Sequence, residues 1–386
     1  VRFRLPLKKI PFNKPYLTGS ETSYIEAAMK SGHIAGNGTY TKKCQAFFEQ
    51  RYGIKKALLT TSCTDALEMA AILLDIKAGD EVIMPAYTFV STANAFVLRG
   101  AKIVFCDSRK DHPGMDEETL EALITERTKA IVPVHYAGVA CDMQKIMKLA
   151  AKYDLKVVED AAHALESHYT FPDGTKKALG SIGHLAAFSF HETKNIISGE
   201  GGLLAINEEA YLERAEIIWE KGTNRSAFFR GEVKEYAWLD LGSSFLPSEV
   251  TAAFLWAQLG KVEIIQNRRI SLWQTYESEL QNLPLKLPDL PAYASNNGNM
   301  FYLLAASKEE RDQIIHYLKA NHISAVFHYL PLHRSIFSLT RQKLHVLPEA
   351  EAYASRLFRI PFYFELSVQE QRIVCDALKE YFKASH

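Results

Sequence analysis

The sequence has no excess of charge of either sign, because 45 lysines and arginines are matched by 45 aspartates and glutamates. Surfaces that bind nucleic acid are as a rule basic, so this balance argues against a nucleic-acid partner and favours a small molecule or another protein chain. No run of about 20 apolar residues occurs, and the opening VRFRLPLKKIPFNKP lacks the apolar segment of a signal peptide. We therefore expect a cytoplasmic protein without membrane insertion.

Cysteine is scarce, and its five copies are scattered without a CxxC pair. This pattern favours free thiols in a reducing compartment, although it does not exclude a disulfide. Two familiar motifs are incomplete: GNGTYT has threonine where a dinucleotide fingerprint has its third glycine, and HETK has lysine where a zincin has its second histidine. His184 with His191, and His328 with His333, have no recognised ligand spacing, so we expect no metal site.

What the sequence does contain is a regular succession of short apolar runs. Runs without polar alternation are typical of strands buried on both faces, and helical segments between them imply crossovers between parallel strands. The predicted strands are 55–61, 80–85, 101–107, 129–135, 155–160, 185–190 and 201–207. The predicted helices between them include 65–76, 116–127 and 142–153. This pattern predicts an α/β fold with a mostly parallel sheet of about seven strands flanked by helices.

The pattern changes after about residue 207. A long helical stretch is followed by the loop GTNRSAFFRGEVKEYAW and by a second long helix, PSEVTAAFLWAQLGKVEIIQNRRISLWQTYESEL. The segment LPLKLPDLPAYASNNGN, rich in proline and polar turn residues, marks a boundary or a long loop. The remainder suggests a compact α+β unit. We predict a large domain with an N-terminal arm over 1–260 and a small C-terminal domain over 261–386.

Ligands of such sheets bind outside the carboxyl ends of the strands, so the loops there are the candidate site. After the first strand, Ser62, Cys63 and Thr64 precede a helix, whose free amides can hold an anion. An equally good interpretation is that Ser62 or Thr64 only caps the helix. After the second strand, Tyr87 and Phe89 stand where a flat ligand could stack, although a lone aromatic residue there is more often core.

Two later loops add charged side chains. Asp160 follows a buried run, where an ionised carboxylate needs a cationic partner, unless it serves as the N-cap of a helix. SFHETK offers Ser189 and Lys194, although a lysine taken alone is a surface charge. Four loops thus supply an anion cradle, a flat surface, a carboxylate and an amine. This ordered set matches pyridoxal phosphate, whose phosphate, ring, pyridine nitrogen and aldehyde need those four partners.

The same segments resemble one protein family. VVEDAAH, FSFHETKN followed by GEGG, SCTDALEMAA and PAYTFVSTANA are similar to the DegT/StrS-type nucleotide-sugar aminotransferases, which are fold type I enzymes dependent on pyridoxal phosphate. The resemblance implies a nucleotide sugar and L-glutamate as substrates, and a homodimer with active sites at the subunit interface. Within the family, VPVHYAGVACDM, EKGTNRSAFFRG and VFHYLPLH are most similar to members that aminate C4 of TDP-4-oxo-6-deoxy-D-glucose for surface polysaccharides.

The resemblance also implies roles for matching residues. Lys194 would be the lysine that joins the cofactor's aldehyde and carries the proton between cofactor and sugar. Asp160 would pair with the pyridine nitrogen and keep it protonated. Phe89 would stack on the ring. His163 stands where many relatives have glutamine and would lie near the ring's 3′ oxygen.

The remaining roles concern the phosphate and the substrate. Cys63, where relatives often have glycine, would cradle the cofactor's phosphate together with Thr64 and Ser189. Asn224, in GTNR, would reach the phosphate of the neighbouring subunit's cofactor. The residues expected to contact the substrate are Tyr87, His328 and His333.

Other activities have to be weighed against this one. Relatives that act as dehydratases carry histidine in place of Lys194, so the lysine argues for transamination. Two alternatives within the family are a transaminase that gives the 4-amino-4,6-dideoxyglucose epimer and one that gives a 3-aminosugar. A non-enzymatic alternative is an effector-binding regulator with this fold; the neutral charge and the lack of a helix-turn-helix segment argue against it.

Overall fold

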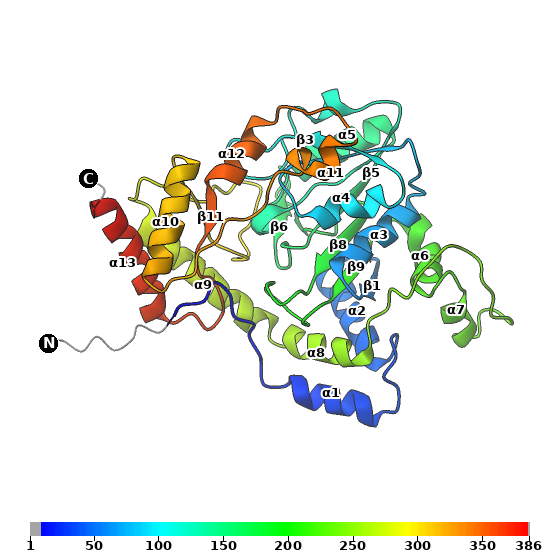
Figure 1. Cartoon of the computed structure of the whole chain (residues 1–386). Coiled ribbons are helices and arrows are strands. Elements are labelled where there is room, and N and C mark those ends of the chain that lie inside the picture. The colour runs from blue at the N-terminus through cyan, green and yellow to red at the C-terminus, as the bar shows by residue number, and fades with distance from the viewer. Residues whose placement is uncertain (1–8, 385–386) are drawn as a thin grey trace.

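Seven strands form one large sheet in the middle of the molecule. The computed structural model describes residues 9–384, and the basic opening at residues 1–8 lies outside the described part. The strands lie side by side in the order β1 (Lys56–Thr60), β9 (Gly202–Ile206), β8 (Leu185–Ser189), β5 (Lys156–Asp160), β4 (Thr128–Ile131), β2 (Glu81–Pro85) and β3 (Lys102–Cys106) (Figure 1). Neighbours are parallel except at β9, which is antiparallel to both β1 and β8. The predicted mostly parallel sheet is confirmed, and each predicted strand overlaps one of these seven.

Helices cover both faces of this sheet. Successive side chains of a strand point to opposite faces, so Leu58 and Val158 belong to one core, and their neighbours Leu59 and Val157 belong to another. The first core is shared with α3 (Cys63–Leu73), α4 (Val90–Val97) and α6 (Leu212–Trp219). The second is shared with α2 (Thr39–Tyr52), α5 (Met143–Tyr153) and α8 (Glu249–Leu259). Burial on both faces explains the unbroken apolar runs in the sequence.

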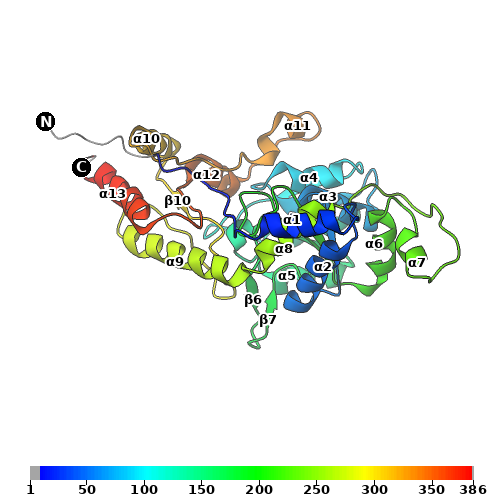
Figure 2. The same cartoon turned by 90° about the horizontal axis from the view of Figure 1, so that it is seen from below.

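The C-terminal part of the chain packs around a third core. The antiparallel pair β10 (Tyr302–Leu304) and β11 (Leu357–Arg359) contributes Leu303 and Phe358 to it. Helices in this part of the chain are α9 (Val262–Leu280), α10 (Lys308–Ala320), α11 (Ile336–Leu339), α12 (Pro348–Arg356) and α13 (Val368–Ala384). Figure 2 shows α9, α10 and α13 at the opposite end of the molecule from α6 and α7 (Arg225–Phe229).

The predicted division between residues 260 and 261 stays a prediction. α8 ends at Leu259 and α9 begins at Val262, so the second long helix expected there is broken in two. However, α9 carries Val262 in a core of the large sheet and Leu272 in the third core. The helix therefore joins the two units rather than belonging to one of them.

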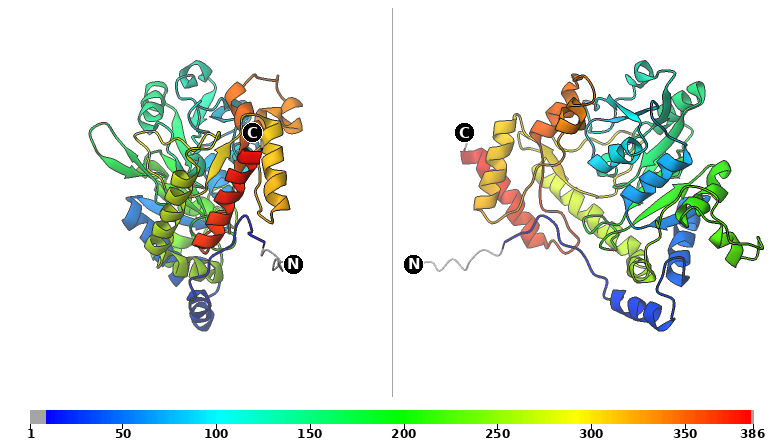
Figure 3. Two further views of the ribbon diagram at one scale, coloured as in Figure 1. Left: turned by 90° about the vertical axis from the view of Figure 1, so that its left-hand side faces the viewer. Right: turned by 45° about the vertical axis from the view of Figure 1, so that its right-hand side comes forward.

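The first described residues pack with the C-terminal unit. Ile10 forms a bridge with Ile323 and lies in the third core, and the carbonyl of Phe12 accepts a hydrogen bond from the amide of Phe362 at 3.1 Å. Figure 3 shows this dark blue segment passing along the C-terminal unit before the chain reaches α1 (Glu21–Lys30). Because α1 packs against α8, the N-terminal arm connects both units.

One predicted helix is wrong. The segment 116–127 forms only a single 3-10 turn, Leu120–Leu123. The chain here buries the carboxylate of Glu117, which accepts a hydrogen bond from the amide of Asp142 at 2.6 Å and pairs with Arg109 at 3.1 Å. Satisfying a buried carboxylate from distant segments outweighs the local helical spacing.

Short elements complete the description. The strands β6 (His168–Thr170) and β7 (Lys176–Ala178) form a separate hairpin. Single 3-10 turns lie at Leu120–Leu123, Tyr136–Gly138, Glu209–Tyr211 and Leu332–Arg334. Between residues 9 and 384, no helix is long and apolar enough to cross a lipid bilayer.

Candidate active site

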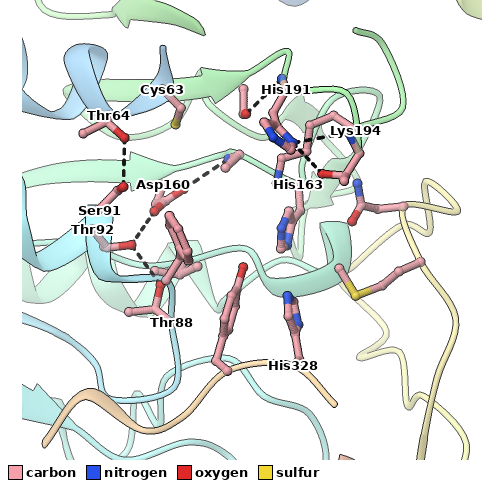
Figure 4. Close-up of a pocket in the computed structure, with 18 of the residues that line it drawn as sticks. Cys63, Thr64, Thr88, Ser91, Thr92, Asp160, His163, His191, Lys194 and His328 are labelled. Carbon is pink, nitrogen blue, oxygen red and sulfur yellow. Dashed lines mark hydrogen bonds between the residues drawn. The ribbon is translucent and has the colours of Figure 1, made fainter. Parts of the chain in front are cut away.

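The loops that follow β1, β2, β5 and β8 meet around one cavity of about 580 Å³. The carboxyl ends of parallel strands lie at one edge of a sheet, which is why loops distant in the sequence converge here (Figure 4). The predicted site residues that line the cavity are Cys63, Thr64, Phe89, Asp160, His163, Ser189, Lys194 and His328. The C-terminal unit contributes Asn299, Met300, Tyr329, Arg359, Ile360 and Phe362. The cavity therefore lies between the large sheet and the C-terminal unit.

Lys194 lies on the tight connection between β8 and β9. Its amide donates a hydrogen bond to the carbonyl of His191 at 2.9 Å, and the amide of Phe190 donates to Gly201 at 2.8 Å, which closes the loop on itself. Burial lowers the pKa of the Lys194 amine to about 8, although the negative charge of Asp160 opposes the shift. A lowered pKa increases the fraction of neutral amine near physiological pH, as a nucleophile or proton acceptor requires.

The start of α3 is packed against β9. A Cβ on Gly202 would lie 2.3 Å from the Ser62 carbonyl carbon and 2.4 Å from the Cys63 nitrogen, so only glycine fits there. The Ser62 hydroxyl accepts a hydrogen bond from the amide of Asp65 at 3.0 Å and caps the helix. Ser62 thus caps the helix and also lines the cavity, together with Cys63 and Thr64 in the first turn. The last two glycines of GEGG therefore bring the lysine loop and the start of α3 together.

Asp160 ends β5 with its side chain in the cavity. It is only 5% exposed, and its carboxylate accepts hydrogen bonds from the Thr92 hydroxyl at 2.7 Å and the Ala162 amide at 3.2 Å. Within residues 9–384, no lysine, arginine or histidine nitrogen lies within 4 Å of it, and burial raises its pKa. No helix follows it, so the alternative of a helix N-cap is wrong. A buried carboxylate in this position needs a cation from outside the described chain.

Two histidines stand beside each other in the cavity wall. The rings of His163 and His328 are nearly parallel, with centroids 6.2 Å apart. The amide of Ala137 donates to His163 Nδ1 at 3.2 Å, and the Tyr136 hydroxyl and His328 Nδ1 lie 2.6 Å apart. Burial lowers the pKa of both imidazoles well below the usual value. Since Nδ1 of His163 accepts a hydrogen bond, its proton lies on Nε2 in the neutral ring.

Phe89 lies at the edge of the cavity, just before α4. Its ring is 55% exposed and lies 6.0 Å from the ring of Tyr329. An aromatic ring that is half exposed at a cavity edge offers a face on which a flat ligand can stack.

Three predicted site residues do not line the cavity in this chain. Tyr87 is buried, with its ring 5.5 Å from that of Tyr136, and so lies behind the wall. His333 is also buried, with Nε2 3.0 Å from a carboxylate oxygen of Glu351. Asn224 lies outside the cavity, where its side chain donates a hydrogen bond to the carbonyl of Glu235 and accepts one from the amide of Ala237.

Sequence reasoning missed an amide cluster that holds the lysine loop. Asn195, next to Lys194, donates to the Asn297 carbonyl at 2.9 Å and accepts from Asn299 Nδ2 at 3.0 Å. Asn297 also donates to the carbonyl of His163 at 2.6 Å. Asn297 and Asn299 belong to the SNNGN segment that the sequence marked only as a boundary or a long loop, and the run of amides there was the available signal.

The comparisons with known proteins agree with this geometry. A sequence profile of the DegT/DnrJ/EryC1/StrS aminotransferase family matches residues 15–379. The chain belongs to this family. An uncharacterised protein of Methanocaldococcus jannaschii is 34% identical over 381 residues, which cover 96% of this chain and 97% of the relative.

Solved structures of similar proteins cover nearly the whole chain. The aminotransferase TlmJ from Streptoalloteichus hindustanus has a TM-score of 0.90 at 26% identity, over 98% of this chain and 100% of that chain. PseC from Helicobacter pylori, an aminotransferase involved in the biosynthesis of pseudoaminic acid, has a TM-score of 0.88 at 25% identity, with the same coverage. Spr1654 from Streptococcus pneumoniae has been solved in PLP and PMP forms and matches at 25% identity. The protein is thus a sugar aminotransferase dependent on pyridoxal phosphate.

The residues of the cavity fit this cofactor. Asp160 is a buried carboxylate without a cation, and a protonated pyridine nitrogen is such a cation. Lys194 offers an amine of lowered pKa to an aldehyde. The close approach of Gly202 to the first turn of α3 leaves that helix start on the cavity, where a phosphate is stabilised.

Proposed function

We propose that this aminotransferase moves the amino group of L-glutamate to the C4 ketone of TDP-4-oxo-6-deoxy-D-glucose and forms TDP-4-amino-4,6-dideoxy-D-galactose for a surface polysaccharide. The presence of Lys194 and Asp160 in one cavity carries the transamination. The choice of sugar is supported by the segments VPVHYAGVACDM, EKGTNRSAFFRG and VFHYLPLH, which are most similar to members with that substrate.

Several residues would hold the cofactor. Asp160 would keep the pyridine nitrogen protonated, since burial makes an unpaired carboxylate there unfavourable. His163 would donate from Nε2 to the ring's 3′ oxygen, and Phe89 would cover one face of the ring. The phosphate would lie against Cys63, Thr64 and Ser189, all of which line the cavity.

Lys194 would also move the protons of the reaction. Pyridoxal phosphate, when bound, supplies an aldehyde that carries the amino group and a ring that takes up the electron pair of the reacting carbon. The neutral Lys194 amine would take the proton from Cα of the donor and later return a proton to C4 of the sugar. The face of the sugar turned toward Lys194 decides between the galacto and the gluco product.

The active site would be completed by a second copy of the chain. The loop around Asn224 exposes the large apolar side chains of Phe229, Tyr236 and Trp238, which are 71%, 54% and 80% exposed. Apolar side chains gathered in this way are typical of an interface. In a homodimer, Asn224 would reach the phosphate of the partner's cofactor, which accounts for its position away from the cavity of its own chain.

The first experiment tests the reaction. Purified enzyme is incubated with TDP-4-oxo-6-deoxy-D-glucose and L-glutamate, and the configuration at C4 of the product is determined from its NMR coupling constants. An axial amino group supports the proposal. An equatorial amino group at C4, or an amino group at C3 when a 3-ketosugar is offered, would instead establish one of the two alternative products.

The second experiment tests the shared site. Lys194→Ala and Asn224→Ala subunits are unfolded, mixed and refolded. If Asn224 acts across the interface, each mixed dimer contains one site with both residues intact, and the mixture is more active than either parent. If Asn224 acts within its own subunit, the activity of the mixture does not exceed the mean of the parents.

A further inference from the structure

Asn297 is a buried asparagine that holds the loop after β5. It lies between α9 and β10 and is 0% exposed. Its side-chain nitrogen donates hydrogen bonds to the carbonyls of His163 and Leu165 at 2.6 and 2.8 Å. Its Oδ1 accepts a hydrogen bond from the amide of Asn299 at 3.0 Å. Because a buried amide is costly to leave without partners, these contacts fix the two segments relative to each other.

The lysine loop is tied to the same residue. Asn195, which follows Lys194, donates from Nδ2 to the backbone carbonyl of Asn297 at 2.9 Å. The side chain of Gln266 donates to that carbonyl as well, at 2.6 Å. Two links in series therefore connect Lys194 with His163. In the first, the Asn195 side chain holds the Asn297 backbone, and in the second, the Asn297 side chain holds the His163 backbone.

The turn Tyr136–Gly138 closes against the Asn297 side chain. A Cβ on Gly138 would lie 2.1 Å from Asn297 Oδ1, and Gly138 has a φ of +80°, so only glycine fits there. The preceding residue, Ala137, donates its amide to His163 Nδ1 at 3.2 Å. The turn thus holds the ring of His163, while Asn297 holds its backbone. Both contacts depend on where Asn297 lies.

The cofactor requires a fixed spacing between these two side chains. Its aldehyde and its 3′ oxygen are carried by adjacent ring carbons, so the amine and the N–H donor that meet them must be held together closely. Lys194 and His163 lie within electrostatic reach of each other in the cavity (Figure 4). We propose that Asn195 and Asn297 are positioning residues that set the spacing between Lys194 and His163. This inference rests on the proposed contact of His163 with the 3′ oxygen.

The first test follows the visible absorption band of the holoenzyme as a function of pH. A hydrogen bond to the 3′ oxygen stabilises its negative charge and makes the Lys194 nitrogen joined to the aldehyde less basic. Loosening His163 should therefore raise the pH at which the band changes. In Asn297→Ala the midpoint should rise by about 0.5 to 1 pH unit, the equivalent of one ordinary hydrogen bond. Asn297→Ser keeps one donor and should shift the midpoint less.

A comparison with a histidine variant separates this inference from the proposed contact itself. The titratable or charged side chains that face His163 are those of Tyr136, Lys194, His328 and Arg359. All are kept in Asn297→Ala, so a shift of the midpoint reports the position of His163. His163→Phe should shift it at least as far, and adding Asn297→Ala should shift it no further. An unchanged midpoint in His163→Phe would refute the contact with the 3′ oxygen, whereas an unchanged midpoint in Asn297→Ala alone would refute the inference.

The second test asks whether the two links act in series. Protein stripped of cofactor is titrated with pyridoxal phosphate, and the concentration for the half-maximal visible band is measured. Asn195→Ala and Asn297→Ala should each raise this concentration about 3- to 10-fold. The double variant should require no more than the weaker single variant, because either change opens the same connection. An increase equal to the product of the two single effects would show independent roles and overturn the inference.

A matched control is provided by Asn207, which makes the same kind of contact away from the cavity. Its side-chain nitrogen donates to the carbonyls of Gly180 and Gly183 at 3.0 and 2.8 Å, and it does not line the cavity. Asn207→Ala should lower the temperature of unfolding but leave the band midpoint and the cofactor titration unchanged. Shifts as large as those of Asn297→Ala would assign the effect to general stability and overturn the inference. If Asn297→Ala does not fold, the midpoint of Asn297→Ser and the cofactor titration of Asn195→Ala decide, and wild-type values in both overturn it.

Discussion

Glu159 and Asp160 are neighbouring buried carboxylates at the end of β5, and they differ in how many hydrogen-bond partners the fold gives them. Their side chains point to opposite faces of the sheet. Glu159, on one face, accepts hydrogen bonds from His135 Nε2 at 2.9 Å and from amides of residues 180–183. Asp160, on the other face, has the Thr92 hydroxyl and one amide. The chain thus satisfies one buried carboxylate completely and leaves the other open to the cavity.

The pKa values express the same difference. Burial raises the pKa of both carboxyl groups, but for Glu159 the hydrogen bond and charge of His135 and the amides outweigh it, so its pKa is lowered. For Asp160 burial dominates and the pKa is raised. Two residues of similar chemistry, one position apart, are therefore distinguished by what the protein supplies to them. A buried charge that the protein leaves unsatisfied marks a place for a ligand.

The largest effect is expected for Lys194→Ala, which tests whether Asp160 is open to the cofactor rather than paired with this lysine. Turnover should be abolished, because no other lysine of residues 9–384 lines the cavity, while thermal unfolding stays close to the wild type. Turnover is measured with ketosugar and glutamate. Lys152→Ala, which removes a surface lysine paired with Glu121, should be fully active. Substantial turnover by Lys194→Ala would contradict the assignment.

Asp160→Asn should reduce turnover by at least about 100-fold, because a neutral amide no longer favours a protonated pyridine nitrogen. Steady-state kinetics at saturating pyridoxal phosphate measure the loss. Thr92→Val removes the hydroxyl that hydrogen-bonds to Asp160 and Thr88 but leaves the carboxylate itself in place, and should have a smaller effect. Near-normal turnover of Asp160→Asn would show that the open carboxylate has no part in the reaction.

Glu159→Gln should affect stability more than turnover. Removing a buried carboxylate charge that accepts four hydrogen bonds lowers the free energy of unfolding by about 3 kcal/mol, since His135 and three amides lose their charged acceptor. Urea unfolding followed by circular dichroism measures the loss. Glu118→Gln, at an exposed pair with Lys145, should leave the urea midpoint unchanged. A stability like that of the wild type would mean that the two carboxylates differ less than their contacts indicate.

The smallest effect is a difference in pH dependence in the protein stripped of cofactor. Folding lowers the pKa of Glu159, so its stabilising contribution is present above the usual 4.5 and is lost as the pH falls through the folded value. Folding raises the pKa of Asp160, so its ionised form opposes folding increasingly as the pH rises from 3.8 through the folded value. Urea unfolding at several pH values should show the Glu159→Gln deficit shrinking in acid, and an Asp160→Asn advantage growing toward neutral pH. Parallel pH curves would contradict this.

Much of the fold could be predicted because buried parallel strands leave a simple pattern. The apolar runs at Lys56–Thr60 and Lys156–Asp160 are unambiguous. The direction of β9 could not be predicted, because a strand buried on both faces has the same sequence pattern whether it runs parallel or antiparallel. The segment 116–127 has helical spacing, but the contacts of Glu117 with residues distant in the sequence override it. Local patterns carry no information about such contacts.

The residues of the site also differ in how far the local sequence predicts them. Asp160 and Lys194 could be predicted because Asp160 ends β5 and Lys194 lies in the loop after β8, and both strands end at the cavity. Arg359 and Asn299 come from the C-terminal unit, and their approach depends on how that unit packs against the sheet. A lone arginine inside the apolar run LFRIPF was the only hint of the first. Tyr87 follows a strand as Phe89 does, yet its side chain lies behind the cavity wall, a difference of orientation that spacing alone does not reveal.

The place of β1 at the edge of the sheet has a consequence for synthesis. Among residues 9–384 its only strand neighbour is β9, and Thr60 pairs with Gly202. While the chain emerges from the ribosome, β1 therefore has no native strand partner until the residues of β9 have followed it. Pairing over such a separation in sequence makes folding slow, and an unpaired apolar strand invites association with other chains. β1, which leads into the start of α3, is thus among the first strands made and among the last to be paired. Added chaperones and a low temperature should therefore improve folding when the protein is overexpressed.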